Sequence, residues 1–149
     1  LYSSAASDVY KRQLSMSFYL KKEGFSGMAN WMRKQSAKEV GHACTIAEYM
    51  VKREATPKVD KVDVVPQGWG NSLEVFEHAL EHEKHISKLI DELVYLASEE
   101  KDNATQDFLW KFVREQVEEE AGVQNIVNLL KKAGDSGILF IDAKLDGCK

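Results

Sequence analysis

Both prolines of this 149-residue chain lie in one short segment. Pro57 and Pro66 fall within residues 54–71, where Gly68 and Gly70 also lie. Because proline ends helices and glycine weakens them, this segment separates two long halves that are compatible with helices. We therefore expect an all-α chain in which one long crossover, residues 54–71, joins the two halves of a helix bundle.

Glycines and capping residues predict four long helices within these halves. Asn71 and Glu74 have the spacing of a capping box, in which each side chain satisfies a free backbone amide of the other residue. The predicted helices end near Glu23, span about Met28 to Arg53, run from an Asn71 or Ser72 cap to about Glu100, and run from an Asn103 cap to Gly134. A short apolar segment, residues 138–141, follows the fourth helix.

The second, third and fourth helices each show a stripe of residues spaced three and four positions apart, as in helices packed against one another. The stripes are Met28, Met32, Gln35, Glu39, His42, Ile46 and Tyr49; Leu73, Phe76, Leu80, Glu83, Ser87, Ile90, Val94 and Ala97; and Leu109, Phe112, Gln116, Glu119, Val123, Ile126 and Leu130. Each stripe is apolar at both ends and polar near the middle. In an antiparallel bundle these middles meet at one height.

The polar middles consist of Glu39 with His42, Glu83, and Gln116 with Glu119. One buried carboxylate costs several kcal/mol unless a partner compensates it. Lysine and arginine are absent from the mid-stripe positions, so we expect no side chain to supply the counter-charge. The pattern therefore predicts that the carboxylates surround a metal cation.

The spacing Glu39-x-x-His42 places both side chains on one helix face, as in the di-iron sites of helix bundles. Oxygen donors with few imidazoles suit iron and favour its ferric state. Each element has a simpler interpretation: a solvated E-x-x-H, a salt-bridged Glu83, or an exposed Gln116 and Glu119 if the stripe is displaced by one position. The three interruptions at one height together favour the metal site.

Other polar and aromatic residues have mainly structural interpretations. The histidines of the third helix could form a second metal set, but we favour a surface location for them; they are His78, His82 and His85. The tryptophans fit packing or interface roles; they are Trp31, Trp69 and Trp110. The remaining acidic residues of the fourth helix fit a solvated face; they are Glu115, Glu118 and Glu120.

Composition narrows the class of protein. Hydrophobic residues make up 44% and charged residues 30%, which suits a single globular domain over residues 1–149. A net charge of −4 argues against nucleic acid as a partner, and no apolar run approaches the roughly 20 residues that cross a bilayer. Cys44 and Cys148 fit two free thiols in a reducing cytosol, and no signal peptide is visible. The start at Leu1 suggests a fragment or processed product.

The crossover has an unusual apolar character. Val59, Val62, Val64 and Val65 favour an extended conformation. Because an apolar extended loop is uncommon on the surface of a monomer, we expect it to cover a partner subunit.

Five stretches spread over about residues 14–147 match a known family: LSMSFYL, GMANWMRKQSAKEVGHA, SLEVFEHALEHEKHI, DFLWKFVREQVEEE and SGILFIDAKL. In these stretches the chain resembles the ferritins, specifically the haem-free bacterial type. The resemblance implies a four-helix bundle with a short fifth helix over residues 137–146. It also implies a cytoplasmic, 24-subunit shell that encloses ferric mineral, with the fifth helix around a symmetry axis and the crossover at a two-fold interface.

The resemblance also assigns roles to the polar residues of the stripes. It implies that Glu39 bridges two irons and that His42 binds the first. Glu83 and Glu119 would bind the second iron, with Gln116 beside them. Gln116 stands where haem-binding bacterioferritins have a second E-x-x-H, which argues against haem, and the lack of a C-x-x-C pair argues against rubrerythrin.

Two departures from the family's pattern concern the metal sites. The family's first helix supplies one more glutamate, and an ungapped count places Ala6 at that position. Residues 1–13 are atypical because AASDVYKRQ does not resemble the family, and one explanation is that it replaces native residues. Lys38 stands where relatives often have a glutamate for a third iron, so a site using Glu115 and Glu118 should be weakened.

The leading hypothesis is iron storage with ferroxidase activity, in which dioxygen or peroxide oxidises Fe(II) at the mid-bundle site. A second hypothesis is a storage-shell subunit whose site is impaired by the missing glutamate. A third is a small bundle enzyme that applies di-iron chemistry to peroxide or an organic substrate, for which the sequence shows neither a substrate pocket nor an electron-transfer partner.

Overall fold

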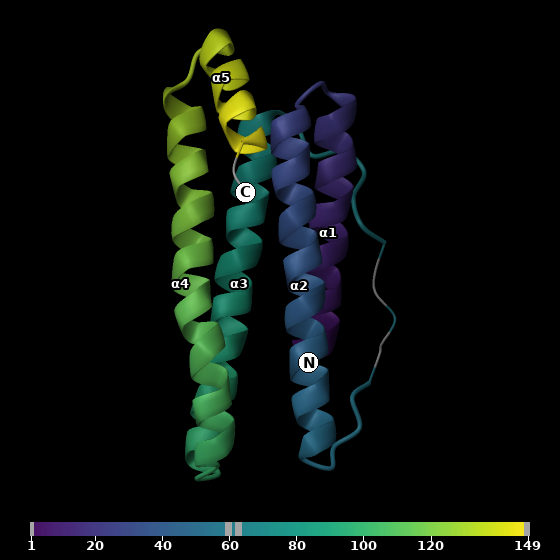
Figure 1. Ribbon diagram of the computed structural model, residues 1–149, viewed down its shortest axis with the longest axis vertical. Helices are drawn as coiled ribbons and strands as arrows, with labels where there is room; N and C mark the ends of the chain where they lie inside the picture. Colours follow the sequence, from purple (N-terminus) through teal and green to yellow (C-terminus); the bar gives the residue numbers. More distant parts are fainter. Residues whose placement is uncertain (1, 59–60, 62–63, 148–149) are drawn as a thin grey trace.

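The computed structural model describes residues 2–58, 61 and 64–147, with side chains from residue 8 onward. Within this part of the chain lie five helices: α1 (Tyr2–Lys22), α2 (Ser26–Lys52), α3 (Ser72–Glu99), α4 (Asn103–Lys132) and α5 (Asp135–Asp146). The helices α1 and α2 lie side by side, as do α3 and α4, and α5 lies at one end of the bundle (Figure 1). The predicted bundle with one long crossover and a short fifth helix is confirmed.

The helix ends follow the expected capping chemistry, with one correction. Asn71 caps α3, since its side chain accepts a 2.9 Å hydrogen bond from the Glu74 amide. The predicted Asn103 cap of α4 is wrong because Asn103 is already the first helical residue. Asp102 takes the role and accepts a 3.1 Å hydrogen bond from the Thr105 amide, three residues ahead as capping requires.

The core consists of two apolar clusters at different heights along the bundle. The cluster near α5 includes Met16, Leu20, Met28, Met32, Phe76, Val123 and Leu130. The cluster toward the other end includes Val9, Ile46, Ile86, Ile90 and Phe112. Buried polar side chains lie between them, so the stripes are apolar at both ends and polar in the middle, as predicted.

The described residues of the crossover lie along the outside of the α1–α2 pair (Figure 1). Val64 is 95% exposed, whereas Val65 packs against the core and the Trp69 indole nitrogen donates to Ser15 Oγ at 3.1 Å. Val59 and Val62 lie outside the described residues. The prediction that a partner subunit covers this segment stays a prediction. The exposed Val64 side chain is an apolar group that such a partner would cover.

The helix α5 packs against α2 and α4. The Met28 amide donates to Asp142 Oδ1 at 2.8 Å, and Asn30 donates to Asp146 Oδ1 at the same distance. Gly27 is required here, since a Cβ atom at this position would lie 1.8 Å from the Asp142 carbonyl oxygen. The backbone of α5 thus sits directly on the first turn of α2.

The remaining candidates from the sequence have varied surroundings. Trp31 contacts Phe76 with ring centroids 5.5 Å apart, in agreement with a packing role, whereas Trp110 is 44% exposed. Cys44 is an exposed free thiol, and Cys148 lies outside the described residues. None of the helices in the described ranges is both long enough and apolar enough to span a membrane.

Candidate metal centre

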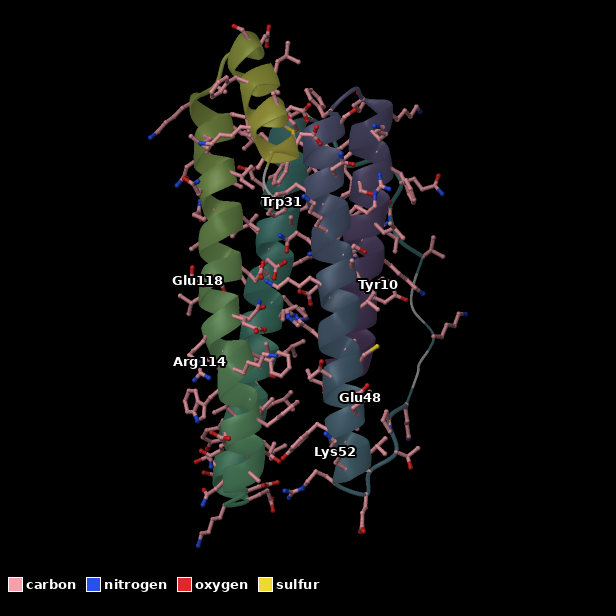
Figure 2. All side chains as sticks on the ribbon, viewed as in Figure 1. Tyr10, Trp31, Glu48, Lys52, Arg114 and Glu118 are labelled. Carbon is pink, nitrogen blue, oxygen red and sulfur yellow. The ribbon has the colours of Figure 1, made fainter. Side chains whose placement is uncertain are left out.

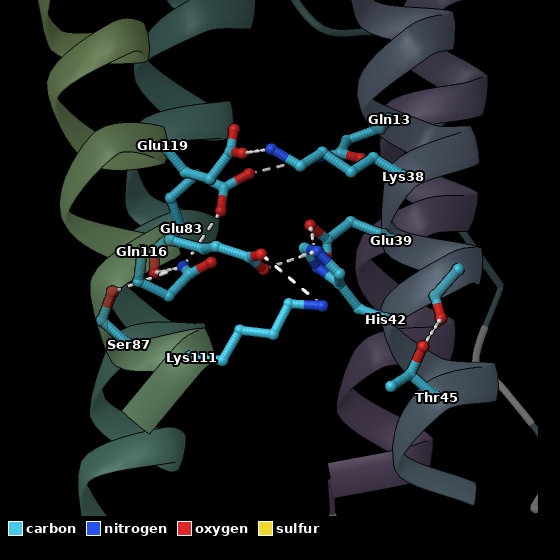
Figure 3. Close-up of polar contacts among 12 residues, drawn as sticks. Gln13, Lys38, Glu39, His42, Thr45, Glu83, Ser87, Lys111, Gln116 and Glu119 are labelled. Carbon is cyan, nitrogen blue, oxygen red and sulfur yellow. Dashed lines mark hydrogen bonds and ion pairs between the residues drawn. The ribbon is translucent and has the colours of Figure 1, made fainter. Parts of the chain in front are cut away.

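A layer of buried polar side chains crosses the middle of the bundle, with contributions from four helices. Figure 3 shows the groups from α1 and α2 facing those from α3 and α4 across the bundle interior. The layer consists of Gln13 from α1, Glu39 and His42 from α2, Glu83 from α3, and Gln116 and Glu119 from α4. The structure therefore brings together all five residues that the stripes predict.

Glu83 lies at the centre of the layer and is 1% exposed. Gln13 donates to its Oε1 at 3.0 Å, and Gln116 donates to its Oε2 at 3.2 Å. Burial, followed by repulsion from Glu39, raises the pKa of Glu83 from 4.5 to about 7. Near neutral pH this carboxyl group can therefore hold a proton or release it to make room for a cation.

Glu39 and His42 form a second part of the layer. The Nδ1 atom of His42 lies 3.3 Å from Glu39 Oε1, and its Nε2 atom lies 3.1 Å from Glu115 Oε2. The edge of the His42 ring meets Phe112, with centroids 5.5 Å apart. The other oxygen of Glu39, Oε2, is buried without a hydrogen-bond partner. An acceptor left in this state costs free energy that a bound cation would recover.

Glu119 has a charged partner that the stripes do not contain. Lys38, one residue before Glu39 and outside the stripe, extends its ammonium group across the bundle to Glu119 Oε1 (Figure 3). The expectation that no side chain supplies a counter-charge is therefore wrong. The physical reason is the long flexible stem of lysine, which reaches the layer from a position that does not face it.

Two further polar contacts were not predicted from the sequence. Gln13 follows Val9 and precedes Met16 and Leu20 at spacings of four, three and four, so a stripe on the first helix could have indicated it. Ser87 lies on its predicted stripe, where its hydroxyl donates to Glu120 Oε1 and lies 3.3 Å from Gln116 Nε2. Glu120 therefore contacts the margin of the layer rather than belonging to a solvated face.

The two glutamates expected at a third iron have different surroundings. Glu115 is half-buried between His42 and Lys111, with its Oε1 atom 3.8 Å from the lysine Nζ. Glu118 is exposed on α4 (Figure 2). The weakened third site stays a prediction.

Ala6, the position of the missing first-helix glutamate, lies within α1, but its side chain is outside the described set.

The histidines of α3 are separate from this layer. His78 and His85 are exposed, in agreement with the predicted surface location. His82 is half-buried, and burial together with the nearby Arg12 charge lowers its pKa to about 4. The surface interpretation thus holds for two of the three histidines.

Taken over the described residues, no group of three or more His, Cys, Asp or Glu side chains is already arranged to hold a metal ion. Instead, the carboxylate oxygens accept from Lys38, Gln13 and Gln116. The donor types nevertheless fit iron, because three buried carboxylates and one imidazole form a hard, oxygen-rich set.

Comparison with known proteins is consistent with this arrangement. Residues 4–133 match the family model described as the ferritin-like domain. The chain belongs to the ferritin family. Among its ferritin relatives, a bacterial non-heme ferritin of Bacteroides fragilis (strain 638R) is 65% identical over 132 residues, covering 89% of this chain and 83% of the relative. One from Staphylococcus aureus (strain MRSA252) is 33% identical over 132 residues, covering 88% and 80%.

Solved structures show the same fold. The open pore ferritin of the hyperthermophilic archaeon Archaeoglobus fulgidus superposes with a TM-score of 0.94 at 37% identity, covering 99% of this chain and 94% of that one. A humanized archaeal ferritin gives a TM-score of 0.96 at 35% identity, covering 99% and 91%. The ferritin resemblance and the ferritin fold are thus confirmed, while the metal-binding roles of individual residues stay predictions.

Proposed function

We propose that this ferritin stores iron and oxidises Fe(II) at the polar layer of its bundle. The single observation that supports this most strongly is the burial of Glu39, Glu83 and Glu119 at one height between two apolar clusters. A core that needed only stability would place apolar side chains there, because buried carboxylates destabilise a fold unless they are paired. A bound cation would supply the positive charge that offsets this cost.

In the proposed reaction, two Fe(II) ions are substrates that bind on either side of Glu39. His42 with Glu39 would bind the first ion, and Glu83 with Glu119 the second. Glu83 releases its proton when a cation arrives, since its pKa of about 7 lies near neutral pH. The amides of Gln13 and Gln116 orient the Glu83 carboxylate through their hydrogen bonds to its two oxygens. Dioxygen or peroxide accepts the electrons, and no haem takes part.

The ferric product would pass to a mineral inside a homo-oligomeric shell, for which we propose 24 subunits in the cytoplasm. This is tested by incubating the metal-free protein with excess Fe(II) in air and separating it by size-exclusion chromatography. We expect iron to co-elute with a large assembly, in amounts far above the few ions that the polar layer can hold. Iron that precipitates or elutes apart from the protein would contradict storage.

A storage subunit with an impaired ferroxidase site is the second candidate. Among the described side chains of α1, the group that reaches the layer is the neutral amide of Gln13, and Asp8 instead pairs with Arg12. The first iron would then have one carboxylate fewer than the ferritin pattern implies. Retention of iron together with an oxidation rate no better than buffer would favour this candidate.

A further inference from the structure

Lys38 is a cationic side chain that contacts Glu119, one of the three buried carboxylates of the polar layer. Its ammonium group pairs with Glu119, which is only 9% exposed at the side chain, whereas the lysine side chain itself is 46% exposed. One end of this lysine therefore reaches the polar layer while its stem remains in contact with solvent.

The Lys38–Glu119 ion pair compensates the negative charge of one of the three buried carboxylates. The other two buried carboxylates use different means: Glu83 accepts two amide hydrogen bonds, and Glu39 lies beside His42. Glu119 depends on the positive charge of Lys38. An ammonium ion and a metal cation compete for such an oxygen, because both need its negative charge and they repel each other at close range.

We propose that Lys38 is a resident counter-cation, which occupies Glu119 in the metal-free subunit and must leave before a second metal ion can bind there. The inference rests on the proposed function, since it concerns the same site. Displacement is feasible because the lysine stem is flexible and already half-exposed, so the ammonium group can turn to water without crossing the core.

Two consequences follow from this competition. The metal-free bundle gains a compensated Glu119, so it folds without a bound ion. The second metal position becomes weaker than the first, because binding there requires that the ion pair be broken. Lys38 would therefore set the difference in affinity between the two metal positions.

The test is a calorimetric titration of metal-free protein with Zn²⁺, which binds to carboxylate and imidazole without redox chemistry. We expect Lys38→Gln to raise the affinity of the weaker Zn²⁺ class by about tenfold, which is the order of magnitude for loss of a competing charged hydrogen bond. The same variant should have a lower thermal midpoint than the parent without metal, and a larger upward shift with Zn²⁺. A lysine with a purely structural role would not produce these opposite effects.

Lys131→Gln is the matched control, since it removes a half-exposed lysine that pairs with Glu77 at 3.3 Å, away from the polar layer. It should leave Zn²⁺ affinity unchanged. Lys38→Arg retains the charge and should bind Zn²⁺ like the parent. If Lys38→Gln does not fold, Lys38→Met, which retains much of the apolar stem, is titrated in its place.

The outcomes separate this inference from the proposed function. Parental or weaker Zn²⁺ affinity in Lys38→Gln, or in Lys38→Met where it is used instead, would overturn the inference. If Glu39→Ala abolished Zn²⁺ binding in the same series, the proposed metal site would still stand. If neither the parent nor any Lys38 variant bound Zn²⁺, both proposals would fail.

Discussion

Glu39, Glu83 and Glu119 are compensated in three different ways. Glu119 has a cation, Glu83 has two amide donors and a raised pKa, and Glu39 has a neighbouring imidazole but one oxygen without a partner. Removing one partner from such a group leaves an uncompensated buried charge, which costs more than the interaction itself contributes. Each carboxylate of the metal-free layer therefore depends on its own partner, and the Oε2 atom of Glu39 stays uncompensated.

The raised pKa of Glu83 predicts a specific pH dependence of stability. Between pH 4.5 and about 7 the folded protein holds a proton that the unfolded chain has released, so the free energy of unfolding falls as pH rises through this window. The shift corresponds to roughly 3 kcal/mol as an upper limit. Glu83→Gln should therefore be more stable than the parent by up to roughly this amount at pH 8, and similar to it at pH 4.

Denaturant unfolding of metal-free protein with a chelator present, at both pH values, measures this difference. Equal free energies of unfolding for the parent and Glu83→Gln at pH 8 would show that ionised Glu83 does not destabilise the fold, which would contradict the raised pKa. Asp91→Asn, an exposed change on the same helix, serves as the control and should have little effect at either pH.

The sequence predicted the central residues because periodicity identifies which Cα atoms face the core. Glu39, Glu83, Gln116 and Glu119 were found in this way, and all four are buried. Lys38 was noted only for a third iron site, and its contact with Glu119 was not predicted, because its backbone position does not face the core and only its long side chain reaches the layer. The preference of each oxygen for an amide, an ammonium group or a metal depends on three-dimensional distances that a spacing pattern does not contain.

Among the secondary-structure elements, the presence of each helix was easier to predict than the residues at which it begins and ends. Asn71 was identified as a cap because Glu74 follows at the right spacing. The choice between Asp102 and Asn103 could not be made from the sequence, since both are good capping residues and are adjacent. In the structure the Thr105 amide donates to Asp102, which identifies Asp102 as the cap of α4.

The contact between α5 and α2 makes a prediction about two glycines. Gly27→Ala should displace α5, because the new Cβ atom would lie 1.8 Å from the Asp142 backbone oxygen, which cannot move independently of its helix. We expect a loss of roughly 2 kcal/mol or more in the free energy of unfolding, together with faster proteolysis within α5.

Gly41→Ala is the matched control in the same helix, since a Cβ atom there meets nothing within 4 Å. It should stabilise the protein by roughly 0.5–1 kcal/mol through helix propensity. Both variants are compared by thermal unfolding and limited proteolysis. Equal stability of the two alanine variants would contradict the close packing of α5 on α2.

At the scale of the whole molecule, apolar side chains remain on the surface of the isolated subunit. In α5, Ile141 is buried, but Leu139 is 64% exposed and Phe140 is 71% exposed. Exposed apolar residues that are grouped in this way are typical of surfaces that contact a partner. They fit the proposed homo-oligomeric shell better than a monomer.

The shell makes a prediction about mass. A subunit of 16.9 kDa gives an assembly of about 406 kDa if 24 copies associate. Native mass spectrometry of the metal-free protein, supported by light scattering in solution, should show this species as the main component. A monomer or dimer would contradict the shell and would favour a small di-iron bundle enzyme.

The initial rate of aerobic Fe(II) oxidation at two Fe(II) ions per subunit, followed by ferric absorbance, tests the proposed ferroxidase site most directly. We predict that the parent oxidises Fe(II) well above a protein-free control and that Glu39→Ala is at least about tenfold slower. Glu48→Ala, an exposed control on the same helix, should have the parental rate. If the parent were no faster than buffer, or Glu39→Ala were as fast as the parent, the polar layer would not be a ferroxidase centre.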